Sequence, residues 1–300
     1  MSIKVILAPS ADLASTINAD VTVEAEYGTV VAEGTVYTAA HHQPGMENHP
    51  APCNDPDIPA LEDGIVLVSH VDLDTFGGCL RAAGVTSLFN DAFQGFWNLA
   101  EFVDLNGPHK LGESGATPEN ILRLHAFWAW KEKVVPRFDT SRTHDVTSYV
   151  YQAGDALAFI LTGDEAHLEA GRTMMARTQE LNVGTFETVW SGGVVVRVTN
   201  DAHGFCNHLY DTPEGDAHAA VAAYNKDGGS ITISLADTVE GVSCRDIMQG
   251  LFGPGAGGHE GIAGSPREQR MTEEDFDRAC DALGTALQAA GAVGGADLNP

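Results

Sequence analysis

The sequence predicts an α/β protein of two domains: an N-terminal domain built on a parallel sheet and a smaller C-terminal α+β domain, with a cleft between them. Three observations predict this class. Residues 65–68, "IVLV", read as a short strand buried on both faces, which is typical of a parallel sheet. Strand-like pieces come first in the chain, and long helical segments follow them. Near residues 183–187 the pattern changes, which divides the chain into domains 1–183 and 184–300.

The N-terminal elements are predicted from periodicity and from cap residues. In chain order they are strands within 3–9 and 21–40, a loop over 41–59, the strand at 65–68, a short helix over 75–83, a strand ahead of Asp104, a helix from Thr117 to about Lys133, and a long helical region over 146–181. The start of the helix at Thr117 is well marked, because a threonine cap is followed by proline at the first helical position.

The C-terminal domain reads as strand, strand, hairpin, strand, helix, loop and helix. The turn "NKDGG" is a hairpin signal between two strand-like runs. A glycine-rich loop follows the helix "CRDIMQGLF", and "TEED" at residues 272–275 caps the last helix. We find no internal repeat.

The charge of the chain limits its partners. It has 42 acidic and 16 basic residues among 300, for a formal net charge of −26. Such a surface repels a polyphosphate backbone, so long nucleic acid is excluded as a general ligand, whereas a small phosphorylated molecule is not. Because no apolar run reaches the length of a membrane span and the apolar stretch near residue 5 is short, we expect neither a membrane span nor a signal peptide. Five dispersed cysteines fit reduced thiols, so we expect a cytoplasmic protein without a membrane partner.

The string "SHVDLDTFGG" carries the first candidate chemistry. His70, Asp72 and Asp74 stand at alternate positions after a strand, so on a continuing strand all three would face the same side. The carboxyl edge of a parallel sheet is where such folds bind their ligands. One imidazole and two carboxylates can hold a divalent ion, although Asp72 could also simply cap the following helix.

Further candidate ligands stand where other strands are expected to end. Asp104 follows the apolar run "AEFV", with His109 five residues later. His41 and His42 follow another strand. Asp145 lies at a helix start, where it could equally be an N-cap. A single histidine or aspartate is more often structural, but four such clusters at chain turns favour a metal site.

The segment "GPGAGGHEGIAGSPRE" is a second candidate site, for binding an anion. Its glycines, Gly257 and Gly258 among them, allow the backbone to approach a ligand and to present N–H groups to an anion. His259 and Arg267 can add charge-assisted hydrogen bonds to a phosphate. A helix end followed by a flexible loop would explain Gly253 but not the later glycines.

Together these segments resemble a known family. "GAGGHEGIAG", between a strand–helix pair and a capped helix, resembles the glycine loop of the DHHA1-type domain of the DHH phosphoesterase superfamily. "VSHVDLDTFGG" is similar to the first motif of that superfamily, and Asp104 in "FVD" to its second. The two domains stand in the family's order, and the likeness touches about two-thirds of the chain.

The chain also departs from the family pattern. The Asp-His-His triplet that names the superfamily is absent: the pair His41–His42 precedes the first motif, and Ala40 stands where the aspartate should be. Thr75 replaces the usual glycine of the first motif. Either the pair is supplied from a rearranged N-terminus, or His109 takes the imidazole role alone.

The resemblance implies a metal-dependent phosphoric ester hydrolase acting on a short oligonucleotide, a nucleoside bisphosphate or a cyclic dinucleotide. It implies metal ligands at His41, His42, His70, Asp72, Asp74, Asp104 and Asp145, catalytic roles for Asp72, Asp74, Asp104 and His109, and substrate binding by Gly257, Gly258, His259 and Arg267. The ion, one or two per chain, is expected to be Mn²⁺, with Mg²⁺, Fe²⁺ or Zn²⁺ as alternatives. A homodimer is a candidate assembly. Two other readings stay open: a catalytically silent nucleotide-binding protein of the same fold, and an unrelated metallohydrolase.

Overall fold

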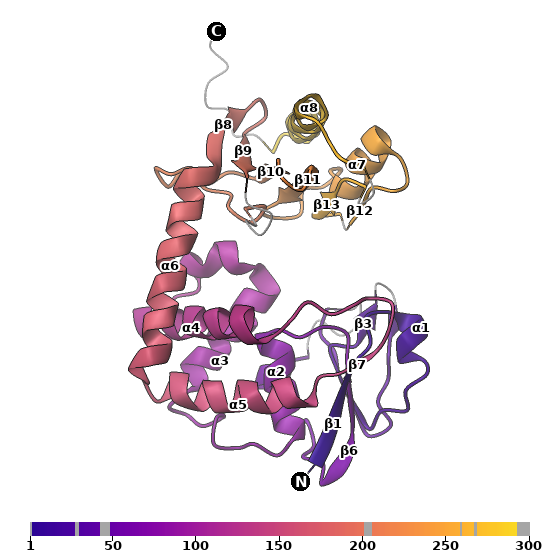
Figure 1. Ribbon diagram of the computed structural model, residues 1–300, viewed down its shortest axis with the longest axis vertical. Coiled ribbons are helices and arrows are strands. Elements are labelled where there is room, and N and C mark those ends of the chain that lie inside the picture. The colour runs from indigo at the N-terminus through magenta and orange to yellow at the C-terminus, as the bar shows by residue number, and fades with distance from the viewer. Residues whose placement is uncertain are drawn as a thin grey trace. The chain divides into compact units, whose positions relative to one another are not determined.

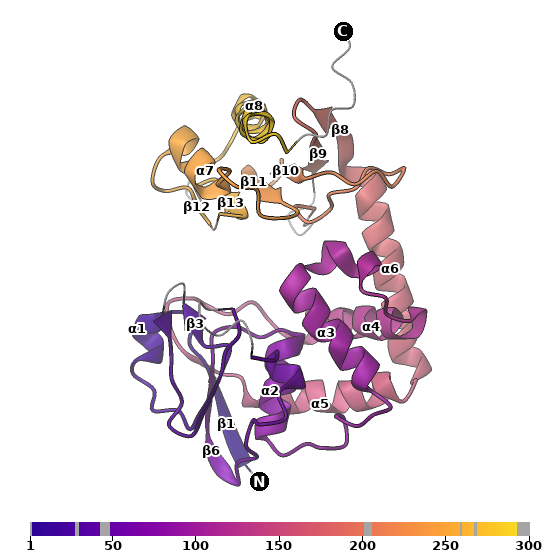
Figure 2. The same ribbon diagram turned by 180° about the vertical axis from the view of Figure 1, so that it is seen from behind.

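The computed structural model describes residues 2–27, 30–42, 49–200, 206–258, 260–266 and 269–292. The chain divides into two compact units, residues 1–175 and 176–300, and each has its own sheet (Figure 1 and Figure 2). The predicted α/β class is confirmed. The division falls inside helix α6 (Glu165–Thr185), whereas the sequence predicts a boundary at the end of that helix, at 183–187.

Unit 1 is built on a five-stranded sheet in the order β5–β2–β6–β1–β7. Its strands are β1 (Ser2–Leu7), β2 (Val21–Val23), β5 (Tyr37–Ala39), β6 (Asp63–Val68) and β7 (His144–Asp145), and a separate two-stranded ladder joins β3 (Glu26–Tyr27) to β4 (Val30–Val31). All strands of the larger sheet run parallel except β7. Val23 pairs with both Ala39 and Val68, so β2, β5 and β6 end level with one another.

Helices follow and connect the strands of this sheet. They are α1 (Ala11–Ala14), η1 (Pro52–Asn54), α2 (Leu73–Ala82), α3 (Gln94–Asn106), η2 (Pro108–Glu113), α4 (Pro118–Val134), α5 (Thr147–Leu161) and α6. The Thr117 hydroxyl caps α4 by accepting from the N–H of Asn120, as predicted. The helical region expected over 146–181 consists of two helices, because Gly163 takes a left-handed φ of 86° and Asp164 then accepts the N–H of His167 at the start of α6.

The strand predicted ahead of Asp104 is wrong, because this segment belongs to helix α3. Phe96, Trp97 and Ala100 are buried at helical spacing, which a strand would not produce. Asp104 stands one turn after Ala100 and therefore lies on the same face of the helix as these core residues.

Unit 2 holds a six-stranded sheet in the order β12–β13–β11–β10–β9–β8. Its elements are β8 (Phe186–Trp190), β9 (Val194–Thr199), β10 (Ala220–Asn225), β11 (Ser230–Leu235), α7 (Cys244–Phe252), β12 (Gly257–Gly258), β13 (Ile262–Gly264) and α8 (Glu273–Ala289). The hairpin predicted at "NKDGG" joins β10 to β11, with Asn225 Oδ1 accepting the Gly228 N–H at 2.8 Å. Thr272 and Asp275 form a capping box at the start of α8.

Each unit has its own hydrophobic core. In unit 1 the inner faces of β1, β2 and β6 pack against α2, α3, α4 and α5, and in unit 2 β9, β10 and β11 pack against α7 and α8. All five cysteines are buried free thiols. Within the described residues, no helix has the length and apolar character needed to cross a bilayer.

Candidate metal centre

Four candidate ligands follow directly from the level ends of three parallel strands. Glu24 comes after β2, His41 and His42 come two and three residues after β5, and His70 comes two residues after β6. Parallel strands that end level deliver the residues after them to one edge of the sheet. The sheet topology therefore brings three separate stretches of sequence to one place.

Helix α2 contributes two carboxylates at the same edge. Strand β6 ends at Val68, so the alternation predicted for His70, Asp72 and Asp74 on a continuing strand is wrong. Asp72 is the N-cap of α2, with Oδ1 accepting the Thr75 N–H at 2.9 Å, and its other oxygen lies 3.0 Å from His70 Nε2. The capping role and the ligand role considered for Asp72 are thus compatible, because each uses a different oxygen.

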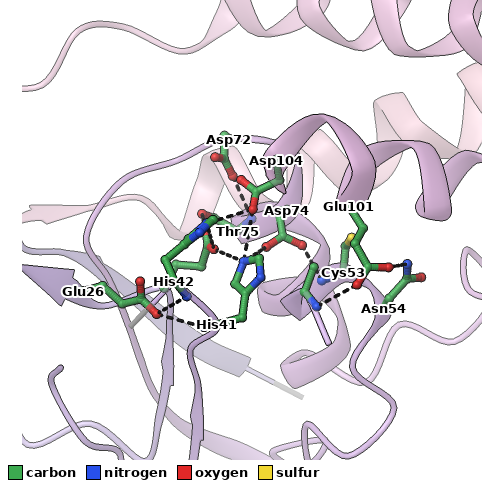
Figure 3. A network of polar contacts seen from close by, with 12 residues as sticks. Glu26, His41, His42, Cys53, Asn54, Asp72, Asp74, Thr75, Glu101 and Asp104 are labelled. Atoms are coloured by element: carbon green, nitrogen blue, oxygen red, sulfur yellow. Dashed lines mark hydrogen bonds and ion pairs between the residues drawn. The ribbon is translucent and has the colours of Figure 1, made fainter. Parts of the chain in front are cut away.

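The acidic and imidazole side chains gather into two ligand groups that share Glu24. We call them the bis-histidine group (Glu24, His41, His42 and Asp104) and the His70 group (Glu24, His70 and Asp72). Within each group one ligand atom from every residue lies within 4.8 Å of all the others. We refer to both groups together with Asp74 as the acidic centre, most of which Figure 3 shows.

The bis-histidine group converges on a buried edge of the sheet. His41 Nε2 lies 2.7 Å from Glu24 Oε1 and 3.1 Å from Asp104 Oδ2. His42 Nε2 lies 2.9 Å from the same Asp104 oxygen and 3.5 Å from Glu24 Oε1. Glu24 and His41 are almost fully buried, whereas the His42 side chain is 40% exposed. One side of the group therefore opens to solvent, where a substrate could enter.

The His70 group uses the other oxygen of Glu24. His70 Nε2 lies 3.2 Å from Glu24 Oε2 and 3.0 Å from Asp72 Oδ2. The His70 side chain is half exposed. Since Oε1 of Glu24 faces one group and Oε2 the other, a single carboxylate stands between two potential ion sites.

Asp74 lies behind the bis-histidine group in the first turn of α2. Its Oδ1 accepts the backbone N–H of Cys53 at 2.7 Å, and its Oδ2 lies 3.6 Å from His41 Nε2 (Figure 3). Burial raises the pKa of Asp74 to about 7 despite the contact with His41. Together with Glu24 and Asp104, it is the third carboxylate that faces the His41 imidazole.

The imidazoles of the acidic centre are strongly basic in the metal-free protein. Burial opposes the charged form of His41, but Asp104, Asp74 and Glu24 raise its pKa to about 12. Asp72 and Glu24 likewise overcome burial and raise the pKa of His70 to about 11. Asp104 raises the pKa of His42 in the same direction. In the metal-free protein, the positive charge of the protonated imidazoles thus offsets the repulsion between the carboxylates, as a bound cation could do.

The carboxylates respond in the opposite direction. Burial acts to raise the pKa of Glu24, but contacts with His41 and His70 outweigh it and the pKa is lowered. The pKa of Asp104 is lowered for the same reason, by His41 and His42 against its burial. These groups stay ionised at neutral pH and offer anionic oxygens to a cation.

Buried carboxylate oxygens without a hydrogen-bond partner indicate whether these residues could hold a cation. Among the described residues, Asp74 Oδ2 and Asp104 Oδ2 are buried without a hydrogen-bond partner, although imidazole nitrogens lie nearby. The nitrogens are therefore close to these oxygens without the geometry of a hydrogen bond. Buried acceptors left in this state are costly, and a cation bound by the bis-histidine group would satisfy the oxygen of Asp104. The donor set of imidazoles and carboxylates fits Mn²⁺, Fe²⁺ or Zn²⁺.

Two further acidic residues hold the surrounding backbone. Glu26 Oε1 accepts the N–H of His41 at 2.9 Å and that of His42 at 3.3 Å, which fixes the segment that carries both imidazoles (Figure 3). Glu101, one turn before Asp104 on α3, accepts the N–H of Ala51 at 3.2 Å and an Asn54 amide N–H at 2.6 Å. Such outer contacts orient ligands and tune a metal site.

Two residues predicted for the site of unit 1 do not belong to the acidic centre. His109 lies in η2, with its ring against Gly107. Asp145 is exposed on β7, where it lies 3.8 Å from Lys4 Nζ and accepts the Thr147 hydroxyl at 2.6 Å. The contacts of Asp145 match the cap-like alternative considered for it.

The glycine segment of unit 2 is described in part. Gly257 and Gly258 form β12, paired with β13. A side chain at Gly258 would come within 2.2 Å of the Ile262 carbonyl oxygen, so the hairpin requires glycine there. His259 and Arg267 lie outside the described residues. The predicted role of this segment in substrate binding therefore stays a prediction.

Glu24 is the residue of the acidic centre that sequence reasoning missed. It lies inside the run "VTVEAEYGTVV", which reads as continuous strand. The alternation of this run continues through Glu24, so no local signal marks the end of the strand there.

No family model and no curated protein matches the chain. Among solved structures it is similar to PggH from Vibrio cholerae, a pGpG-specific phosphodiesterase. The two share 14% sequence identity over 78% of this chain and 82% of that chain, with a TM-score of 0.47. Similarity at this level does not assign an activity.

Proposed function

We propose that this chain is a metal-dependent phosphoric ester hydrolase for a small phosphorylated substrate, namely a short oligonucleotide, a nucleoside bisphosphate or a cyclic dinucleotide. The observation that carries the proposal is the pair of ligand groups sharing Glu24 at the carboxyl edge of the parallel sheet. The resemblance of two sequence motifs to the DHH phosphoesterases agrees with it. In this proposal His41 and His42 supply the imidazoles that the missing triplet would have provided.

Each side chain of the acidic centre has a proposed role. Asp104, His41 and His42 would hold one cation together with Glu24, and His70 and Asp72 would hold a second. When bound, divalent ions in such a centre lower the pKa of a water molecule and neutralise charge on phosphate oxygens. Asp74 adds negative charge next to His41 and keeps its imidazole directed at the centre. The half-exposed rings of His42 and His70 leave room for a substrate on the solvent side.

The phosphate of the substrate also needs a cation from the protein, and Lys131 on α4 is our candidate. Its neighbour Trp130 packs on Phe76 of α2 with ring centroids 6.1 Å apart, which directs this turn of α4 toward the start of α2. Burial lowers the pKa of Lys131, and the charge of Asp72 opposes that shift. The Lys131 ammonium is thus close enough to the Asp72 carboxylate for the charge of Asp72 to act on it. Lys131 is proposed to contact a non-bridging phosphate oxygen.

Unit 2 is proposed to bind the rest of the substrate. Backbone N–H groups of its glycine segment at Gly257 and Gly258, together with His259 and Arg267, would hold a second anionic group. The acidic composition of the chain favours a short substrate over a long strand.

The test is metal-dependent turnover. Chelator-treated protein should not hydrolyse bis(p-nitrophenyl) phosphate or a 5′-phosphorylated dinucleotide, and Mn²⁺ should restore hydrolysis of both. Asp74→Ala should abolish that activity while the protein stays folded, and Asp145→Ala, at an exposed position outside both ligand groups, should retain it. Protein that binds Mn²⁺ or nucleotide yet never turns over would instead identify a silent binding protein. Hydrolysis of amides but not of phosphoesters would identify another metallohydrolase.

A further inference from the structure

Glu24 has an unusual backbone conformation. Among the described residues it is the only one other than glycine with a positive φ, at 48°. A side chain in this region crowds its own backbone, so the conformation costs free energy and persists only where surrounding contacts enforce it. Such residues cluster at functional sites. The contacts that enforce this conformation therefore bear directly on the ligand shared by both groups.

Hydroxyl groups hold Glu24 from two sides. The Ser69 hydroxyl donates to the backbone carbonyl oxygen of Glu24, and the Thr75 hydroxyl donates to its carboxylate Oε2 at 3.2 Å. The N–H of Glu24 donates to the Ala39 carbonyl oxygen at 2.9 Å. Ser69 comes directly after β6 and Glu24 directly after β2, so this contact ties together the ends of two neighbouring parallel strands.

Ser69 also contacts the ligand next to it. Its Oγ lies 2.8 Å from Nδ1 of His70. A hydroxyl has one proton, and the Glu24 carbonyl oxygen can only accept, so that proton is used there. The Ser69 oxygen must then accept from Nδ1–H of His70. Nδ1 carries a proton and Nε2 is left as the ligand atom, facing Asp72 and Glu24.

We propose that Ser69 is a positioning residue of the metal centre: one hydroxyl fixes both the strained backbone of Glu24 and the tautomer of His70. The inference rests on the proposed metal-dependent function. A purely structural role would differ, because a serine that only satisfies a strand-end carbonyl would affect folding without selecting which nitrogen of His70 binds an ion.

The experiment compares metal-free wild-type protein with Ser69→Ala, Ser69→Thr and, as a matched control, Ser148→Ala on the exposed face of α5. Mn²⁺ binding is followed by calorimetry, and the His70 ring nitrogens are followed by ¹⁵N NMR in Zn²⁺-loaded protein. Ser69→Ala should weaken binding of the His70-group ion by about 10- to 100-fold, as loss of an outer contact to a ligand does. It should also remove the spectrum of a ring protonated at Nδ1 and ligated at Nε2. Ser69→Thr keeps the hydroxyl and should restore both properties.

The outcomes separate this inference from the proposed function. Wild-type protein that binds no divalent ion would overturn the proposed function and the inference with it. Wild-type protein that binds ions while Ser69→Ala matches it in affinity and His70 spectrum would overturn the inference alone. If Ser69→Ala does not fold, Ser69→Cys takes its place, since a thiol is a weaker donor of similar size. Equal Mn²⁺ affinity in Ser69→Cys and Ser69→Thr would then overturn the inference.

Discussion

The three imidazoles of the acidic centre should carry protons at neutral pH until ions displace them. Their pKa values are raised, to about 12 for His41 and about 11 for His70, because each faces two or more carboxylates. An imidazole must be neutral at the nitrogen that binds a metal. Ion binding at pH 7 should therefore release protons from His41, His42 and His70 together.

The number of protons released sets how strongly ion binding depends on pH. Three histidines with the ordinary pKa of about 6.5 would together release only about 0.7 proton at pH 7. His41 and His70 are protonated beforehand and each releases about one proton, and His42, whose pKa is raised, releases up to one more. Binding of both ions therefore releases between about two and three protons, and the product of the two ion affinities changes up to about 1,000-fold per pH unit. Asp74, with a pKa raised to about 7 by burial, adds a further fraction of a proton.

The assay is Mn²⁺ calorimetry at pH 7 in buffers of different ionisation enthalpy, where the slope of observed enthalpy gives the protons released. His42→Asn should lower the count by about one relative to wild type, because it removes one displaced proton. His144→Asn, outside both ligand groups, should leave the count unchanged. Fewer than one proton released by wild-type protein, with affinity flat between pH 6 and 8, would refute the reasoning.

Three further predictions concern the same centre. The metal-free protein should lose thermal stability as pH rises from 6.5 toward 9. Histidines of the unfolded chain lose their protons above a pKa of about 6.5, whereas the imidazoles of the folded centre keep theirs because their pKa values are raised, so unfolding releases protons and is favoured as the pH rises; a melting temperature that stays constant or rises over this interval contradicts this. Glu24→Gln should weaken Mn²⁺ binding by about 100-fold or more, beyond the usual effect of an outer contact, and exposed Glu33→Gln should not; similar affinities in calorimetry would count against a shared ligand. Lys131→Met should raise KM for a phosphoester by about tenfold, as loss of a charged hydrogen bond implies, while exposed Lys133→Met should leave KM unchanged; equal KM values would remove Lys131 from substrate binding.

The fold class and much of the acidic centre could be predicted because strand ends and cap residues leave local signals. His41, His42 and His70 were found since each follows a short apolar strand. Asp104 was found for a wrong reason, because its apolar run belongs to a helix whose buried spacing begins eight residues earlier, at Phe96.

Glu24 could not be found in the same way, because the end of its strand is decided by distant residues. Its left-handed φ depends on a hydroxyl 45 positions later in the chain, at Ser69. The alternating pattern "VTVEAEY" continues through Glu24 without a break. Local sequence therefore predicts a strand at the position where tertiary contacts turn the chain.

The most direct test is anomalous diffraction at the manganese absorption edge from crystals of the wild-type protein soaked in Mn²⁺. We predict two anomalous peaks, one between Asp104 and the two adjacent imidazoles and one between His70 and Asp72, with the two carboxylate oxygens of Glu24 divided between them. A strong peak located elsewhere in the chain, or ions at this edge of the sheet that Glu24 does not coordinate, would contradict it.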